Sequence, residues 1–272
     1  MYYKDKGIVL KSDELKDADK LVTLFLYENG KNRIVFKGVS KPKSKKVASA
    51  ELGSYIEVFF YKKSKNAPSY ASEIKIIKSF SKIRENPVKF LYLNYILELF
   101  LNFSLEEKKD IKLFNFLLNS LIALQRADIK SIESIVRYIE YRLIQLNGIL
   151  PDFSKCNKCN KKINQDAIID FKESHILCKN CYTFVGNKHT CSLHLKYNVL
   201  KYIDILSKSS FKNINFNIPA TINKEIKVIF YNLIVNYLSK ELKSYKIIYK
   251  MLQEDDAKRT TESCAPSPFT FS

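Results

Sequence analysis

Four cysteines carry the clearest chemical signal in this sequence. They form two CxxC pairs, Cys156 with Cys159 and Cys178 with Cys181, separated by eighteen residues. Each CxxC turn can present two thiolates on one side, and four thiolates around Zn²⁺ complete a tetrahedral structural site that leaves no position for a substrate. The spacing therefore predicts a structural zinc site. The alternative interpretation is two dithiol pairs that serve redox or disulfide exchange.

Three neighbouring residues could replace a cysteine as a ligand, but none fits the spacing as well: His175, His189 and Cys191. We interpret them as ordinary polar neighbours. The insert between the pairs contains Ala167-Ile168-Ile169-Asp170-Phe171, which is typical of a strand in a zinc ribbon. A metal would stabilise this short segment, which cannot bury a core of its own.

Segments with helical periodicity precede the cysteines. Residues 87–103 and 111–125 are apolar nearly all round, as expected of helices inside a bundle, and Asn86-Pro87 provides a helix start. Between residues 131 and 147 an apolar stripe predicts core packing, with Arg137, Tyr141 and Gln145 expected on the opposite face. The stripe comprises Ile132, Ile135, Val136, Ile139, Leu143 and Leu146.

Helical periodicity returns after the cysteines, from Ser192 to Leu206 and from about Asn223 to Lys250. The second of these segments carries many lysines among its apolar residues. A basic amphipathic helix can bind nucleic acid, an acidic peptide or a membrane surface, but a core helix with a solvated face explains the same pattern.

The first eighty residues read as β structure. Five short segments are rich in β-branched and aromatic residues and are bounded by turn formers such as Asn29-Gly30. They are residues 7–10, 20–26, 33–36, 55–60 and 72–77. Five strands in this length predict a small closed barrel, best matched by the OB-fold, whose open face and loops bind oligonucleotides. An SH3-like barrel is the alternative.

A lysine-rich loop lies between the third and fourth of these strands. It runs from Lys37 to Lys46 without an acidic residue, and its lysines are Lys37, Lys41, Lys43, Lys45 and Lys46. A cationic loop of this kind can follow a phosphate backbone, release counterions and bind without reading base sequence. Arg33 lies close by in sequence. The simpler interpretation is a solvated charged loop.

Aromatic residues flank the loop: Phe36, Tyr55, Phe59, Phe60 and Tyr61. Strand alternation sends only half of them outward, where they could stack on bases. The acidic residues Asp13, Glu14, Asp17 and Asp19 could in principle contribute to a two-metal site, but a solvated turn explains them as well, and no further carboxylates are spaced to complete such a site.

The composition is that of a globular, strongly basic protein. Lys and Arg number 46 against 28 Asp and Glu, a formal charge of +18, and residues 1–80 and 186–252 contribute a net +8 each. A positive potential attracts polyanions, so nucleic acid is the first partner to consider. The chain lacks GxxxxGK[ST], GxGxxG and HExxH motifs, an apolar run long enough for a membrane span and a signal peptide. We expect a cytoplasmic protein.

These patterns predict an α+β, multidomain chain: an N-terminal five-stranded OB-fold barrel followed by a mostly α-helical domain that a four-cysteine zinc element interrupts. The expected parts are the barrel (1–80), the first helical part (81–150), the zinc element (151–185), the second helical part (186–252) and a disordered tail (253–272).

The succession of parts over residues 1–250 resembles the RecO family of bacterial recombinational DNA-repair mediators. The similarity is carried by residues 7–10, 19–25, 30–31 and 37–45 in the barrel and by residues 143–159 and 177–181 around the cysteines. Lys37, Lys41, Lys43 and Lys45 match the basic, DNA-facing segment of that family, and Lys46 extends it. The tail after residue 252 has no family counterpart.

The resemblance implies an OB-fold domain, a zinc element and a non-enzymatic role in DNA repair and recombination. Members bind single- and double-stranded DNA, anneal complementary strands and help RecA to replace single-strand-binding protein. Implied partners are RecR and the acidic tail of single-strand-binding protein. Two other classes remain open from the residues alone: a zinc-stapled nucleic-acid enzyme or accessory fragment of the nuclease or ligase type, and a protein-binding scaffold.

Overall fold

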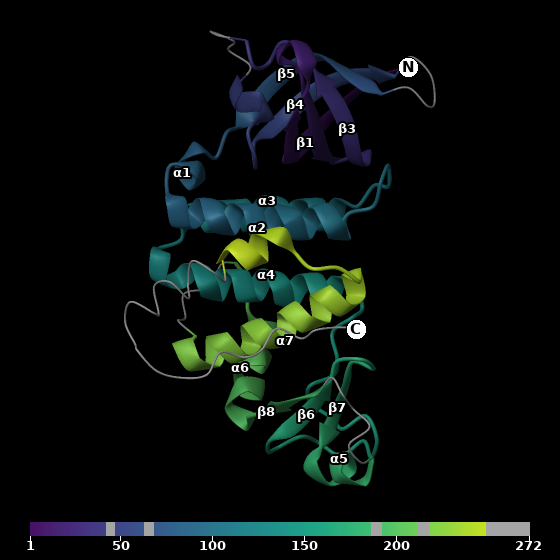
Figure 1. Ribbon diagram of the computed structural model, residues 1–272, viewed down its shortest axis with the longest axis vertical. Coiled ribbons are helices and arrows are strands. Elements are labelled where there is room, and N and C mark those ends of the chain that lie inside the picture. Colours follow the sequence, from purple (N-terminus) through teal and green to yellow (C-terminus); the bar gives the residue numbers. More distant parts are fainter. Residues whose placement is uncertain (42–46, 63–67, 186–191, 212–217, 249–272) are drawn as a thin grey trace.

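A computed structural model describes residues 1–41, 47–62, 68–185, 192–211 and 218–248. Its three parts follow one another along the longest axis (Figure 1). A β-barrel lies at one end, a stack of helices forms the middle, and a small sheet that carries the cysteines lies at the other end. The loop lysines Lys43, Lys45 and Lys46, the possible ligands His189 and Cys191, and the tail 253–272 fall outside the described residues.

The first eighty residues form the predicted five-stranded barrel. Its strands are β1 (Tyr2–Glu14), β2 (Lys20–Leu26), β3 (Gly30–Phe36), β4 (Tyr55–Lys62) and β5 (Ser69–Lys78). They close in the order β1-β2-β3-β5-β4, with β3 parallel to β5 and all other neighbours antiparallel. This closed barrel with a non-sequential strand order confirms the OB-fold prediction.

Strand alternation fills the barrel. In β4 the alternate residues Ile56, Val58 and Phe60 are buried in its core, whereas their neighbours on the strand lie on the outer surface. The β2–β3 turn needs Gly30, which has φ +62°, because a Cβ at that position would lie 2.2 Å from the carbonyl oxygen of Lys108. The turn therefore packs directly on the chain between two helices.

The described helices are α1 (Ser81–Arg84), α2 (Pro87–Phe103), α3 (Ile111–Arg126), α4 (Ile132–Leu146), α5 (Lys179–Val185), α6 (Tyr197–Lys208) and α7 (Ala220–Leu238). Of these, α2, α3 and α4 begin at or within one residue of the predicted positions, whereas α1 and α5 were not predicted. The side chain of Asn86 accepts a hydrogen bond from the Lys89 amide (3.0 Å) and caps α2, and Asp110 caps α3 in the same way through Leu113 (2.9 Å).

Helix α4 is the centre of the helical body. It contacts α2, α3, α6 and α7, and most of its predicted stripe is buried. The face opposite the stripe is buried as well, since Arg137 and Tyr141, which we expected there, are 2% and 5% exposed. The reason is that neighbouring helices cover both sides of α4. Leu146, placed in the stripe, is 46% exposed because it ends the helix.

Two helical predictions after the cysteines need correction. Residues Ser192–Leu195 form a strand, β8, and the helix begins only at Tyr197. The strand forms because β6 (Ala167–Asp170) pairs with it on one side and with β7 (His175–Cys178) on the other. The long basic helix is also interrupted, since α7 ends at Leu238, Ser239 follows it with φ +51°, and a separate helical segment covers residues 243–248.

Candidate metal centre and nucleic-acid surface

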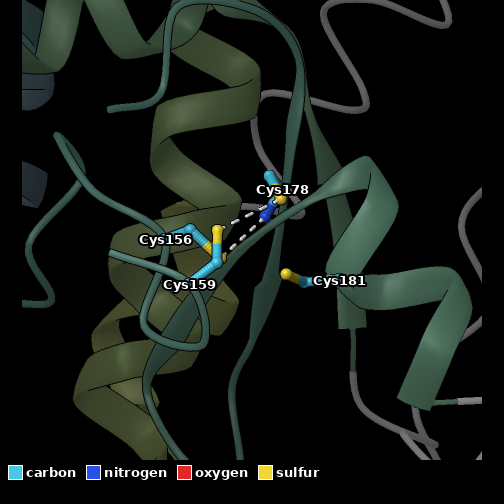
Figure 2. A group of neighbouring side chains, drawn as sticks. All are labelled: Cys156, Cys159, Cys178 and Cys181. Carbon is cyan, nitrogen blue, oxygen red and sulfur yellow. Dashed lines mark hydrogen bonds between the residues drawn. The ribbon is translucent and has the colours of Figure 1, made fainter. Parts of the chain in front are cut away.

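The four predicted cysteines meet in one cluster. Their Sγ atoms all lie within 4.8 Å of one another, and those of Cys159 and Cys178 are 3.9 Å apart. Zn–S bonds of about 2.3 Å in a tetrahedron place sulfur atoms roughly 3.8 Å apart, so the cluster has the dimensions of a zinc site. Figure 2 shows the side chains of both pairs converging on a shared centre.

Three local structures hold the four cysteines. Cys156 and Cys159 lie on a tight turn that the backbone bond from Asn160 to Cys156 closes (2.8 Å). Cys178 is the last residue of β7, and Cys181 lies in the first turn of α5 (Figure 2). Asn157 joins the two halves, because its amide donates to Ile176 (2.8 Å) and its side chain accepts from the Ile176 amide (2.7 Å).

The environment of the thiols favours a cation at this centre. Burial alone would raise the pKa of Cys156, but backbone N–H donors, first that of Cys178 at 3.4 Å, lower the pKa to about 6. Cys181 shows the opposite effect, because burial and the adjacent Cys178, Cys159 and Cys156 thiols raise its pKa to about 12. Four thiolates this close repel one another unless a metal ion neutralises them.

This arrangement also bears on the alternatives. The four cysteines are free thiols gathered in a single group, whereas redox-active dithiols would need only the two separate pairs. His175, at the exposed start of β7, is not part of the group, so its interpretation as a neighbour is confirmed. The cluster is compatible with zinc, which would hold the turn, β7 and α5 together.

Three of the predicted DNA-binding residues are described, and all are exposed on the barrel: Arg33, Lys37 and Lys41. Arg33 lies on β3, Lys37 directly follows that strand, and Lys41 ends the described part of the loop. These cations therefore occupy one strand and the loop that extends it. They extend from the middle of β3 into the loop that follows it.

Two of the acidic residues near the barrel form hydrogen bonds with the first residues of the lysine loop. Asp19 accepts a hydrogen bond from the Gly38 amide (2.7 Å), and Glu14 accepts one from the Ser40 hydroxyl (3.1 Å). Glu14 also pairs with Lys20 (3.0 Å), while Asp13 pairs with Lys11 (2.7 Å). These partners account for three of the four carboxylates in structural terms.

The flanking aromatic residues divide between the inside and the outside, as alternation predicts. Phe36 and Phe60 are buried in the barrel core, whereas Phe59 and Tyr61 lie on the outer surface. Tyr55 is also on the outside, but it packs against Phe114 of α3, with ring centroids 6.1 Å apart. Of these five aromatic residues, Phe59 and Tyr61 of β4 are therefore the two whose rings lie outside the barrel and away from α3.

A buried charge network was missed by the sequence analysis. Inside the helical body, Arg137 Nη1 lies 2.8 Å from Glu140 Oε2, and the Tyr95 hydroxyl donates to Glu140 Oε1 (2.6 Å). Burial raises the pKa of Glu140, and the Arg137 guanidinium opposes that rise. The i, i+3 spacing of Arg137 and Glu140 on a helix is visible in the sequence, but the burial of this pair depends on how the helices pack.

The barrel, the helical body and the four-cysteine element together define a multidomain α+β protein with an OB-fold and a site suited to zinc. Among its described residues, no helix is both long and apolar enough to span a membrane. Residues 1–80 match the family model described as Recombination protein O N terminal, and residues 84–246 match Recombination protein O C terminal. The chain belongs to the RecO family.

Individual relatives agree with this assignment. A protein of Clostridium novyi is 30% identical over 237 residues, which cover 87% of this chain and 88% of the relative. Similar proteins of Caldicellulosiruptor saccharolyticus and Desulforamulus reducens are 28% and 27% identical and cover 89% and 93% of this chain and 96% of each relative. All three are named DNA repair protein RecO.

Proposed function

We propose that the protein is a mediator of DNA repair and homologous recombination in the RecF pathway. In this role it binds single- and double-stranded DNA, anneals complementary strands and assists RecA loading on DNA coated with single-strand-binding protein. The observation that carries the proposal is membership of the RecO family across both its N-terminal and C-terminal parts. The net charge of +18 agrees with a polyanionic partner.

The barrel surface suits contact with phosphates. Arg33, Lys37 and Lys41 are exposed along β3 and the loop that follows it, and the sequence of that loop continues with lysines to Lys46. Annealing requires weak contacts that ignore base sequence and reduce the repulsion between two strands, and exposed Lys and Arg side chains supply such contacts by displacing counterions. The proposal needs no nucleotide hydrolysis, and we propose that the protein is not an enzyme.

The proposed protein partners are also inferred from membership of the RecO family. RecR and the acidic tail of single-strand-binding protein are the proposed partners, and a basic protein is electrostatically complementary to an acidic tail. The zinc element would keep a fixed shape for the end of the molecule opposite the barrel, since a closed four-thiolate site is structural.

The rival function is that of a zinc-stapled nucleic-acid enzyme or accessory fragment, and a scaffold for proteins is the third candidate. The carboxylates of Asp13, Glu14 and Asp19 already have ion-pair or hydrogen-bond partners, which argues against the enzyme, because a two-metal site needs carboxylates free to bind metal. Incubating labelled DNA with the protein and Mg²⁺ or Mn²⁺ distinguishes them: the mediator leaves the DNA intact, and the enzyme degrades or joins it.

The decisive experiment changes the charge of the loop and measures both strand annealing and binding of single-stranded oligonucleotides. The loop variant replaces four lysines by glutamate: Lys41, Lys43, Lys45 and Lys46. The control variant makes the same change in charge at four exposed lysines elsewhere: Lys112, Lys130, Lys172 and Lys240. We expect the loop variant to lose annealing and binding, and the control to retain most of both. Equal behaviour of the two variants would contradict a specific role for the loop.

A further inference from the structure

Three tyrosines lie side by side on the outer surface of the barrel. Tyr2 of β1 is the cross-strand partner of Tyr61 of β4, which in turn is the partner of Tyr70 of β5. Their ring centroids are 5.6 Å apart for Tyr2 and Tyr61 and 5.9 Å for Tyr61 and Tyr70. We call this row, which crosses three strands that adjoin one another in the barrel, the tyrosine row.

The tyrosine row combines one exposed ring with two partly exposed ones. Tyr2 is 81% exposed, and Tyr61 and Tyr70 are half-buried. Helix α3 covers a different part of β4, six residues away, where Tyr55 meets Phe114. Three adjacent aromatic side chains on an outer surface are a larger exposed apolar feature than scattered single residues, and such features mark interaction sites.

Cations border one end of the row. Strand β3 continues it, because Val35 is the partner of Tyr70. Arg33 and Lys37 lie two residues to either side of Val35, so strand alternation places them on the same outer face. The Lys37 ammonium lies 5.2 Å from the centre of the Tyr70 ring, which is a cation–π contact. A charged edge therefore runs beside the rings.

This combination fits one class of ligand. Proteins that hold single-stranded nucleic acid without reading sequence combine a positively charged track for the backbone with aromatic rings on which bases stack. The bases of a duplex are already stacked and cannot reach such rings. A peptide tail rich in acidic residues would use the cations but would leave the row of rings without a function.

We propose that the tyrosine row is a stacking platform for the bases of single-stranded DNA, with Arg33 and Lys37 holding the phosphates along its edge. The proposal rests on the DNA-binding function proposed above and adds to it the residues that contact bases. It also explains how the barrel would distinguish single strands from duplexes. Cross-strand tyrosine pairs stabilise the sheet as well, so the test must separate binding from folding.

The first experiment replaces two rings of the row and measures affinity for a fluorescent oligo(dT). In the Tyr61→Leu/Tyr70→Leu variant the stacking surface is lost, and we expect affinity to fall on the order of tenfold to a hundredfold. The matched Tyr61→Phe/Tyr70→Phe variant keeps the rings and is expected to bind as the unsubstituted protein does. Affinity for a duplex of the same length should change less than threefold in both.

The salt dependence separates stacking from charge. Because stacking releases no counterions, the leucine variant should keep the slope of log affinity against log salt, whereas Arg33→Ala/Lys37→Ala should reduce it by about 1.4 for two lost phosphate contacts on a single strand. A thermal unfolding curve shows whether each variant is folded at the temperature of the binding assay. Comparison with the phenylalanine variant shows whether a loss of affinity is caused by loss of the aromatic rings.

A second experiment reports stacking directly. The chain contains no tryptophan, so Tyr61→Trp introduces a single tryptophan within the row, whose emission can be excited selectively over that of the tyrosines. Stacked bases should quench its fluorescence when oligo(dT) is added. Tyr237→Trp is the control, since Tyr237 of α7 is 50% exposed but stacks on Phe103, away from the barrel, and its emission should not change.

The outcomes are distinct. If the unsubstituted protein does not bind oligo(dT) at low salt, the proposed DNA-binding function is wrong and the stacking platform with it. If it binds, but the leucine variant binds equally well or the emission of the Tyr61→Trp variant is unquenched at saturation, then only the stacking platform is overturned. Loss of affinity in the folded leucine variant together with quenching supports it.

Discussion

Replacing Arg137 by methionine tests how much of the stability depends on the charge pair inside the helical body. Its guanidinium lies 2.8 Å from the Glu140 carboxylate, and the two side chains are 3% and 0% exposed. Removing one member leaves a charge buried in a medium of low polarity, which typically costs about 3–5 kcal/mol. Domains are stable by only about 5–15 kcal/mol, so Arg137→Met should lower the urea midpoint substantially at an unchanged slope.

The chain offers a matched control on another helix. Lys208 and Asp204 of α6 are separated by 2.6 Å, but their side chains are 73% and 59% exposed. Because water solvates both charges, Lys208→Met should cost less than about 0.5 kcal/mol. The two variants break ion pairs of similar length and differ in burial, so the comparison isolates the cost of an uncompensated buried charge.

A double variant completes the test. Arg137→Met/Glu140→Gln removes both charges, while the amide oxygen of the introduced glutamine still accepts the hydrogen bond from Tyr95 that Glu140 receives at 2.6 Å. Since the buried charge is gone, we expect at least half of the stability lost by Arg137→Met to return. If Arg137→Met costs no more than Lys208→Met, or if the double variant is less stable than the single one, the reasoning about burial is refuted.

Three further predictions concern zinc binding, the pH dependence of stability and the helical segment that follows α7. Cys156→Ser should reduce bound zinc below one ion per chain, measured by metal analysis, and should lower the thermal midpoint. Burial lowers the pKa of Lys227 to about 8, against about 10.4 in an unfolded chain. Between these values the unfolded chain binds more protons, so the free energy of unfolding should rise with pH there, by up to about 3 kcal/mol; Lys227→Met should flatten this rise, measured by urea unfolding across pH 7–11. Glu98 accepts hydrogen bonds from the amides of Lys243 (2.9 Å) and Ser244 (2.8 Å); Glu98→Ala should cost about 1 kcal/mol and speed proteolysis near Ser239, whereas unchanged cleavage would contradict this capping role.

Local patterns were sufficient to predict a five-stranded barrel and the four-cysteine cluster. Alternation in β4 and the Asn29-Gly30 turn indicate the strands, whereas the strand order that distinguishes the OB-fold from other small barrels is seen only in the structure. The CxxC spacing is local chemistry as well, because each pair lies on a turn or at the junction of a strand and a helix. The four sulfur atoms meet as the spacing predicts.

Other features depend on partners far away in the sequence, and local patterns do not predict them. Arg137 is buried because α7 and α2 lie on either side of α4, which no helical period shows. Ser192–Leu195 is a strand only because β6 offers a free edge. The tyrosine row was missed for the same reason: Tyr2 and Tyr70 are 68 positions apart, and only the strand register places Tyr61 between them.

The attachment of the barrel to the helical body bears on how the proposed DNA surface would work. The first residues of β3 are bonded to the chain between α2 and α3, since the Lys31 amide donates to Leu105 (3.2 Å) and the Glu107 amide donates to Lys31 (3.0 Å). Ile8, Leu10 and Phe25 of the barrel also belong to the core of the helical body. Arg33 lies two residues beyond Lys31 on the same strand, so its position is fixed relative to that body. A single strand bound along β3 and the tyrosine row would therefore be presented in one orientation, rather than on a barrel that turns freely.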